Sequence, residues 1–292
     1  MDGFRLRNIF NTVDLIVVSY LFDTLILSFF IREPGGWIHP VLFRLLAFFT
    51  IGIILYHDNS YPSKASRIIR YFYPVVLLSY LYGDTAELNH IFFTQPLDNI
   101  LVNLEQNIFG YQPALEFSKA IPQKWFSELM NFGYFSYYIF IFGIATAAFK
   151  KHNEDKEEIM FLIIGSFIFY YVFFIIFPTY GPQFYILNED LPPPDGIFSR
   201  LVHLAQQIGE VPTGAFPSSH VGMMLVFCYI SWKYLKKRFA VSALFTIIIT
   251  FATVYIKAHY AIDIIAGYIS VPVVIFFSKK YYSLSKKILN PA

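Results

Sequence analysis

Residues 159–178 read IMFLIIGSFIFYYVFFIIFP, a stretch of twenty residues without a charged side chain. A helix needs about 20 apolar residues to cross the hydrocarbon of a bilayer. Further apolar stretches of this kind lie at 13–31, 37–56, 69–82, 125–149, 218–233, 239–256 and 260–278. The sequence therefore predicts an all-α, polytopic transmembrane bundle of about eight spans. The 69–82 stretch is short, so this span must be tilted or extended at its ends.

The composition also indicates a chain that is solvated mainly by lipid. Of the 292 residues, 56% are hydrophobic and 14% are charged, whereas a soluble domain has about 25% charged residues. The 22 tyrosines suit the membrane–water boundary, where one end of the ring is wet. A net charge of +2 gives no support for a nucleic-acid partner. The single cysteine, Cys228, excludes a disulfide within the chain.

The lysines and arginines predict the orientation. If the N-terminus is cytoplasmic, sixteen of the 22 fall in inside segments, including Arg5 and Arg7, and five fall in outside segments. Arg44 lies within a span. Because cytoplasmic loops carry the excess of Lys and Arg, we expect residues 150–158 inside and residues 179–216 outside.

Residues 83–124 differ from the spans because they are polar and interrupted by prolines. Within them, four apolar residues share one helical face: Ile100, Leu101, Leu104 and Ile108. We expect Asp98 to cap the start of this helix and Gly110 to end it. This pattern predicts a helix that lies at the membrane interface.

Three short segments concentrate the residues that could carry chemistry. They read FPTYGPQ at 177–183, GAFPSSH at 214–220 and KAHYAID at 257–263. Each lies at the end of a predicted span, and all three fall on the predicted outer side. Orientation and motif position are independent inferences, and they agree.

The second segment predicts the start of a helix that can bind an anion. Pro217 suits the first turn, and Ser218 and Ser219 add hydroxyl groups to the free backbone N–H groups there. Such an end attracts phosphate, and His220 lies beside it. A simple capped helix start with an incidental histidine is the alternative.

The third segment pairs a histidine with a carboxylate. His259 and Asp263 are four residues apart, so on a helix they share a face. A carboxylate fixes the tautomer of an imidazole and stabilises its charged form, as a nucleophilic histidine requires. A His–Asp pair that serves only packing is one alternative, and a metal site using both histidines and Asp263 is another. Gly267, one turn further, is expected to let a neighbouring helix approach.

Together with ATVYIKAHYAIDIIAG at 252–267, these segments resemble the type 2 phosphatidic acid phosphatase superfamily. They are most similar to the branch of fungal inositol phosphorylceramide synthases and their many bacterial relatives. The resemblance covers roughly 69–278 and implies a six-span core there, after two N-terminal spans in 1–68 and before a basic cytoplasmic tail at 279–292. It also implies a bacterial inner membrane, with the active site facing outward.

The resemblance implies that His259 is the nucleophile, that Asp263 is its partner and that His220 protonates the leaving oxygen. The resemblance also implies that Ser218 helps to hold phosphate and that no metal or other cofactor takes part in this step. The family's phosphatases have an arginine six residues before the nucleophile, where this chain has Thr253. Gln183 stands where related proteins often have a second arginine.

Phosphate still needs positive charge, and two residues are candidates for supplying it. Lys257 is two residues before His259, about 200° away on a regular helix, so it must lie on the turn before the helix to reach phosphate. Arg200, in the outer segment, is the second candidate, and a solvated loop charge is the alternative interpretation of this residue. We expect Ser219 and Gln183 to complete the phosphate-binding set.

The sequence thus predicts an integral-membrane enzyme that cleaves or transfers a lipid phosphate ester through a phosphohistidine. The acceptor is water in a phosphatase and a hydroxyl group in a transferase. A transporter with a proton relay through Asp23, Asp263 and the two histidines is an alternative. A family member that has lost its activity is another. Lipid phosphate and the bilayer are the only partners that the sequence predicts.

Overall fold

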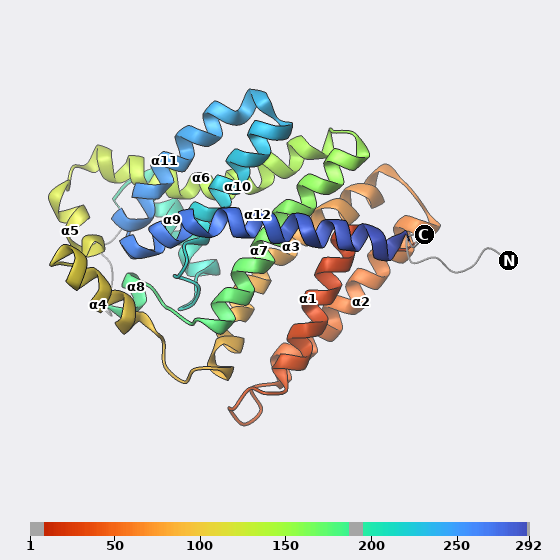
Figure 1. Ribbon diagram of the computed structural model, residues 1–292, viewed down its shortest axis with the longest axis horizontal. Helices are drawn as coiled ribbons and strands as arrows, with labels where there is room; N and C mark the ends of the chain where they lie inside the picture. The colour runs from red at the N-terminus through yellow and green to blue at the C-terminus, as the bar shows by residue number, and fades with distance from the viewer. Residues whose placement is uncertain (1–8, 187–194, 291–292) are drawn as a thin grey trace.

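The computed structural model describes residues 9–186 and 195–290, and within these ranges the chain is helical and has no strand (Figure 1). The long helices coincide with the expected spans: α1 (Thr12–Ser28), α2 (Ile38–Ser60), α3 (Lys64–Leu88), α6 (Lys124–Phe149), α7 (Asn153–Ile176), α10 (Ser219–Tyr234), α11 (Phe239–Tyr255) and α12 (Ala261–Leu289). Shorter helices join them: α4 (Asp98–Phe109), α5 (Pro113–Ala120), α8 (Pro182–Tyr185) and α9 (Ile197–Gly209). The all-α prediction is confirmed.

Five helical segments of the described chain are long and apolar enough to cross a membrane. They are α2, α6, α7, the stretch Lys236–Tyr255 that contains α11, and α12. Helices α1 and α10 have only 17 and 16 residues, and α3 carries several charged residues in its first turns. The chain is therefore an integral membrane protein, while the total of eight spans stays a prediction.

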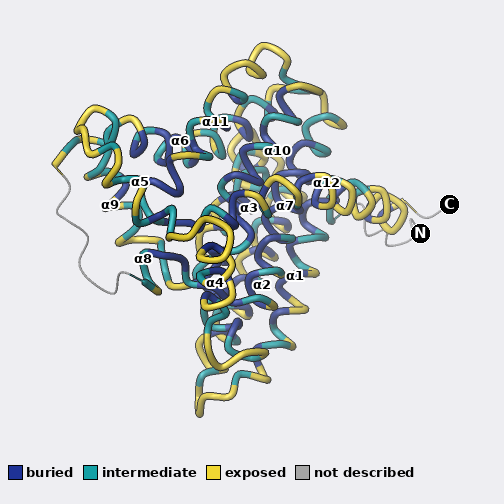
Figure 2. Tube along the Cα trace, turned by 60° about the vertical axis from the view of Figure 1, so that its left-hand side comes forward, coloured by how far each residue is buried: buried dark blue, intermediate teal, exposed yellow. Residues whose placement is uncertain are grey.

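Helix α7 forms the centre of the bundle. In its most apolar window 78% of the residues are buried, against 28–39% in the other four segments. It packs against α1, α3, α10 and α12. Figure 2 shows buried residues concentrated along α3, α7 and α10, with exposed residues at the C-terminal end of α12. The outer helices expose large apolar side chains such as Leu46, Phe49 and Ile269, as expected of surfaces that face lipid.

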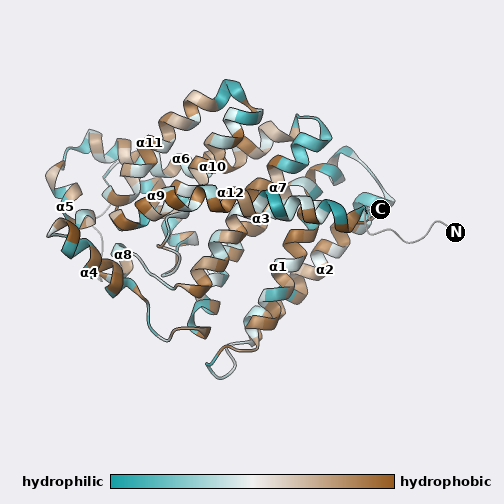
Figure 3. Ribbon diagram, viewed as in Figure 1, coloured by the Kyte–Doolittle hydropathy of each residue, from teal (hydrophilic) through white to brown (hydrophobic). Residues whose placement is uncertain are grey.

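The ends of several helices differ from the sequence boundaries. Helix α3 extends the short 69–82 stretch in both directions, as that span required. The residues expected to form a tail continue α12 as far as Leu289. Figure 3 shows hydrophilic residues where α6 meets α7, where α10 meets α11, and at the C-terminal end of α12. These are the basic segments behind the predicted orientation, although Arg5 and Arg7 lie outside the described residues.

The charged residue expected within a span is paired. Arg44 of α2 is fully buried and makes two hydrogen bonds to Asp84 of α3, at 3.0 and 2.6 Å. Its guanidinium also donates to the Thr24 hydroxyl group and the Pro40 carbonyl group. A buried charge is tolerated when it is paired and hydrogen-bonded in this way. The pair therefore holds α2 against α3.

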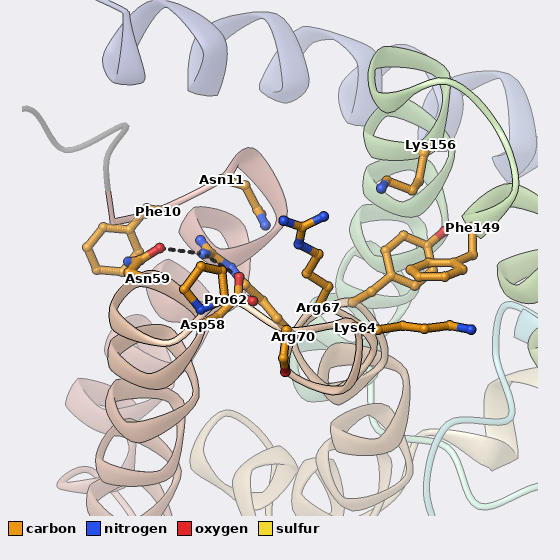
Figure 4. Close-up of a pocket in the computed structure, with 12 residues that line it drawn as sticks. Phe10, Asn11, Asp58, Asn59, Pro62, Lys64, Arg67, Arg70, Phe149 and Lys156 are labelled. Carbon is orange, nitrogen blue, oxygen red and sulfur yellow. Dashed lines mark hydrogen bonds and ion pairs between the residues drawn. The ribbon is translucent and has the colours of Figure 1, made fainter.

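A second ion-pair cluster closes the basic end of the bundle. Arg70 of α3 contacts Asp14 of α1 at 2.7 Å and Asp58 of α2 at 3.1 Å. Figure 4 shows Arg67 and Lys156 extending into the neighbouring cavity, which has a volume of about 660 Å³. Lys156 lies near the start of α7, whereas the first sequence motif follows the other end of that helix.

Helix α4 is built differently from the expectation. Its N-cap is Leu97, without a side-chain cap, so the capping role predicted for Asp98 is wrong. Gly110 does end the helix, in a left-handed conformation with φ 77°. Three of the predicted apolar residues are exposed, namely Ile100, Leu104 and Ile108, while Leu101 is buried together with Asp98 and Glu105. The helix thus turns a carboxylate-bearing face inward and an isoleucine-rich face outward.

Candidate active site

The three motifs, far apart in the sequence, are joined by backbone hydrogen bonds. Thr179 accepts hydrogen bonds from the N–H groups of Ala215 and Phe216, at 3.2 and 2.8 Å. The Gln183 N–H donates to the Lys257 carbonyl group at 3.1 Å. The first motif therefore lies between the other two and holds them in a fixed relation.

Gly181 allows this close approach. Its φ of 87° is in the left-handed region, which favours glycine. A Cβ atom at this position would lie 2.8 Å from the Ala258 carbonyl oxygen and 3.2 Å from the Ala215 Cβ. A larger residue would push the His259 loop away from the loop that leads to His220.

His259 precedes α12 and does not lie on it. The helix begins at Ala261 with Tyr260 as its N-cap, and the Asp263 carboxylate accepts a hydrogen bond from the Tyr260 N–H at 2.8 Å. The expected His259–Asp263 contact exists, with Nδ1 and Oδ2 3.3 Å apart. A capping interaction, and not a shared helical face, brings the two side chains together.

The hydrogen bonds of His259 define its tautomer. Its Nδ1 lies 2.8 Å from the Ala215 carbonyl oxygen, which can only accept, so Nδ1 carries the proton. Nε2 is then left with a free electron pair. Burial lowers the pKa of His259 from 6.5 to about 4, although the Ala215 carbonyl group and the Glu210 carboxylate act in the opposite direction. The imidazole is therefore neutral at physiological pH, with Nε2 as its acceptor atom.

His220 faces this electron pair. Its Nδ1 lies 3.0 Å from Nε2 of His259. Its ring is held between two tyrosines of α6, with centroid distances of 4.7 Å to Tyr134 and 4.4 Å to Tyr137. The two predicted catalytic histidines are thus in direct contact, and His220 donates to His259 in this arrangement.

The start of α10 differs slightly from the expectation. Ser218 is the N-cap and accepts a hydrogen bond from the Val221 N–H at 3.3 Å, so Pro217 precedes the helix and is not in its first turn. The Ser218 N–H donates to the Asp263 carbonyl group at 3.0 Å, which links this helix start to the third motif. Ser218 and Ser219 are both buried beside the histidine pair.

Neither expected cation joins the histidines. Lys257 does lie on the turn before α12, with φ 68°, but the charge that acts on it is that of Lys119 on α5. Burial and this neighbour lower the pKa of Lys257. Arg200 is exposed on α9. Within residues 9–186 and 195–290, neither side chain forms a hydrogen bond or ion pair with His220 or His259.

A carboxylate that the sequence analysis missed occupies this region. Glu210, just after α9, accepts hydrogen bonds from the Tyr134 hydroxyl group, from Gln183 at 2.7 Å and from Gln206 at 3.2 Å. The predicted phosphate ligand Gln183 is therefore bound to an acidic residue. The one sequence signal that could have indicated a role for Glu210 is its position four residues before Gly214, where the second motif begins.

Helix α4 supplies two further carboxylates that the sequence analysis did not assign to the site. Asp98 accepts hydrogen bonds from the N–H groups of Tyr180 and Gly181, at 2.7 and 2.8 Å, and from the Tyr260 hydroxyl group at 3.0 Å. Glu105 accepts from the Ile262 N–H at 3.1 Å. Burial raises the pKa of both carboxyl groups. The helix thus clamps the first and third motifs from outside.

The structure also bears on the metal site and the proton relay, which the sequence left open as alternatives. In the part of the chain that the structure describes, no group of three or more His, Cys, Asp or Glu side chains is placed to hold a metal ion. Asp23, the remaining member of the hypothetical proton relay, lines a separate cavity between α1, α7 and α12.

Comparison with known proteins identifies the family. The model of the PAP2 superfamily matches residues 100–277, more than half of the chain, including all three motifs. The chain belongs to the PAP2 superfamily. A PA-phosphatase related-family protein of Dictyostelium discoideum is 25% identical over 173 residues, which is 51% of this chain but only 31% of that relative's length. No solved structure matches the chain.

The family match places the chain in the PAP2 superfamily, while the chain covers only about a third of the Dictyostelium relative's length, so its activity is a matter for proposal. The contacting histidines lie within the matched region, at the junction of α10, α11 and α12. Its substrate, and the branch of the superfamily to which it belongs, are matters for proposal.

Proposed function

We propose that this chain transfers a phosphoryl or phospho-headgroup from a lipid phosphate ester to His259, and then to water or a hydroxyl group. The observation that carries the proposal is the orientation of His259. Its Nδ1–H is held by the Ala215 carbonyl group and by Asp263, so that the electron pair of Nε2 points toward His220. This arrangement fits a nucleophile opposed by a general acid.

The contact between the histidines describes the enzyme before substrate binds. A separation of 3.0 Å between Nδ1 of His220 and Nε2 of His259 is a hydrogen-bond distance and leaves no space for a phosphorus atom. The substrate must therefore displace one ring. His220 rests between Tyr134 and Tyr137 without a further hydrogen bond in the described chain, whereas His259 is fixed at Nδ1, so we expect His220 to move.

The reaction has two balanced steps. In the first, Nε2 of His259 forms a bond to phosphorus, the bond from phosphorus to the lipid oxygen breaks, and protonated His220 gives its proton to that oxygen. The phosphohistidine is cationic at the ring and is stabilised by Asp263. In the second step, His220 takes a proton from water or a hydroxyl group, whose oxygen attacks phosphorus and releases neutral His259.

The surface beside the site supports a lipid substrate. A cavity of about 790 Å³ lies between α5, α11 and α12 and reaches Ala261, two residues from His259. Its lining is largely apolar and includes Phe117, Phe251 and Ile265. An acyl chain in this groove would bring its ester phosphate toward the histidines. We further propose that the site faces outward and that the acceptor is a hydroxyl group, as in the inositolphosphotransferase-like branch.

Trapping the covalent intermediate tests the proposal. Purified protein is mixed with a phospholipid radiolabelled at phosphorus and quenched within one turnover. We expect a protein-bound label that is stable in base and lost in acid, as a phosphoramidate is. His259→Ala should abolish it. His203→Ala is the matched control, because this exposed histidine on α9 forms a hydrogen bond only with Gln207 among the residues that the structure describes.

The phosphohistidine proposal is wrong if His259→Ala retains the label or if the label proves base-labile, as an acyl phosphate on Asp263 would be. Asp263→Asn should slow labelling by about 10²–10⁴-fold if Asp263 orients the histidine as a triad carboxylate does. A correctly folded protein that forms no label with any donor would favour the interpretation as an inactive family member.

A further inference from the structure

The charge of Glu210 is not compensated in the free protein. Its three hydrogen-bond donors, Tyr134, Gln183 and Gln206, are all neutral. Across residues 9–186 and 195–290, no lysine or arginine forms an ion pair or hydrogen bond with this carboxylate. A carboxylate has about four acceptor sites, so one remains for a ligand.

Glu210 is coupled to the catalytic pair by contact and by charge. Tyr134 stacks on the His220 ring and donates its hydroxyl proton to Glu210. The carboxylate also acts electrostatically on His259. Any headgroup attached to a phosphorus atom between the histidines therefore lies in the field of Glu210.

The positive charge available to phosphate is small. In the described chain neither Lys257 nor Arg200 forms a hydrogen bond or ion pair with the histidines, so the main source is the start of α10, where the N–H groups of Ser219 and His220 have no partner within the helix. A helix N-terminus is equivalent to roughly half an elementary charge. That suits the single charge of a phosphodiester, whereas a phosphomonoester carries about −1.5 to −2 at neutral pH.

We propose that Glu210 binds the cationic amine of a zwitterionic phosphodiester lipid, and so selects an aminoalcohol headgroup over anionic headgroups. This inference rests on the proposed function, whose donor class it narrows. The amine of an ethanolamine headgroup is two carbons from the phosphate oxygen and so is tethered close to the histidines. Pairing it with Glu210 leaves phosphate to the α10 N-terminus, while a headgroup without a cation is repelled.

Comparison of donor lipids tests the assignment. Step one releases diacylglycerol from every glycerophospholipid donor, so this product is measured for four of them in mixed micelles: phosphatidylethanolamine, phosphatidylglycerol, phosphatidylinositol and phosphatidic acid. We expect kcat/KM to be highest for phosphatidylethanolamine. Glu210→Gln, which keeps the shape and removes the charge, should lower that value by about ten- to hundredfold, the range for one hydrogen bond to a charged group.

The same substitution should lower turnover of the other three donors less than that of phosphatidylethanolamine, because their headgroups have no amine for Glu210 to bind. Glu87→Gln is the matched control, since this carboxylate on α3 is partly exposed and its one ion pair within residues 9–186 and 195–290 is with His39. Equal losses for all four donors with Glu210→Gln would overturn the assignment and make Glu210 a structural residue. A wild-type preference for phosphatidylinositol or phosphatidic acid would overturn it as well. If no donor gives His259-dependent release, the proposed function itself fails.

Discussion

Gly267 is the position at which one added methyl group should move the start of α10, which carries His220, away from α12. It lies on α12, where a Cβ atom would stand 2.9 Å from the Ser218 carbonyl oxygen and 3.5 Å from the Val221 Cβ. Ordinary contacts begin at 3.4 Å, so in Gly267→Ala the start of α10 must retreat by roughly half an ångström. The obstructing atom is backbone, which no side-chain rotation can relieve.

The displacement has a predictable size in both activity and stability. His220 follows Ser218 by two residues, and a misplacement of about 1 Å can cost roughly 10²-fold in rate, so we expect a loss near tenfold. Overpacking costs about 1–3 kcal/mol, partly offset by up to about 1 kcal/mol because alanine favours helix over glycine. The variant should therefore unfold at a slightly lower temperature than wild type.

Diacylglycerol release and thermal unfolding in the same detergent measure the two effects. Gly143→Ala on α6 is the control, because nothing lies within 4 Å of its added Cβ. It should be as active as wild type and equally or more stable. If Gly267→Ala matches this control in both measurements, the close approach of α12 to Ser218 does not position His220, and the reasoning fails.

Three other measurements follow from the structure. Because folding lowers the pKa of His259 from 6.5 to about 4, the contribution of neutral His259 to stability is complete above pH 6.5 and is lost as the pH falls toward 4. The acid limb of kcat/KM should likewise have its midpoint near pH 4. A midpoint near 6.5 would contradict the argument that burial lowers this pKa. Arg44→Met should lower the free energy of unfolding by about 3–5 kcal/mol, since it leaves the Asp84 charge buried without a partner. Arg44→Met/Asp84→Leu should recover most of that loss, as measured by denaturant unfolding. A double variant no more stable than the single one would contradict the pairing. Cysteines introduced at Asn153 and Asp195, in a Cys228→Ser background, should react with an impermeant thiol reagent in intact cells only at Asp195, and labelling at Asn153 instead would reverse the orientation.

The bundle could be predicted from the sequence because its signal is local. Each long helix is a run of apolar residues between polar breaks, and every such run became a helix, including the short one that α3 extends. The close approach of a neighbouring helix at Gly267 could also be predicted, since a small residue one turn from Asp263 has few other uses. The pairing of Arg44 with Asp84 was not, because it joins residues on different helices that no periodicity connects.

The site was predictable only as far as its motifs extend. The pairing of His259 with Asp263 was expected from their spacing, but its structural basis and the direct contact between His220 and His259 were not. Spacing alone suggested a shared helical face, whereas the chain begins α12 at Ala261 and uses Asp263 to cap it. Glu210 escaped prediction because its partners come from α6, α8 and α9, which only the folded chain brings together.

Helix α4 has an exposed apolar face, which the sequence indicated, and an inward face with carboxylates, which it did not. Its apolar residues predicted a surface helix, and Ile100, Leu104 and Ile108 are indeed exposed, at 50%, 40% and 57%. The inward face instead holds the loops of the first and third motifs through Asp98 and Glu105. Without these carboxylates, the N–H groups of the two loops would need hydrogen bonds to water or phosphate instead. If the exposed face of α4 lies in lipid, this one twelve-residue helix fixes both the position of the bilayer surface and the geometry of the histidine pair. Loss of the lipid contact would then first change the hydrogen bonds that the N–H groups of Tyr180, Gly181 and Ile262 donate to α4.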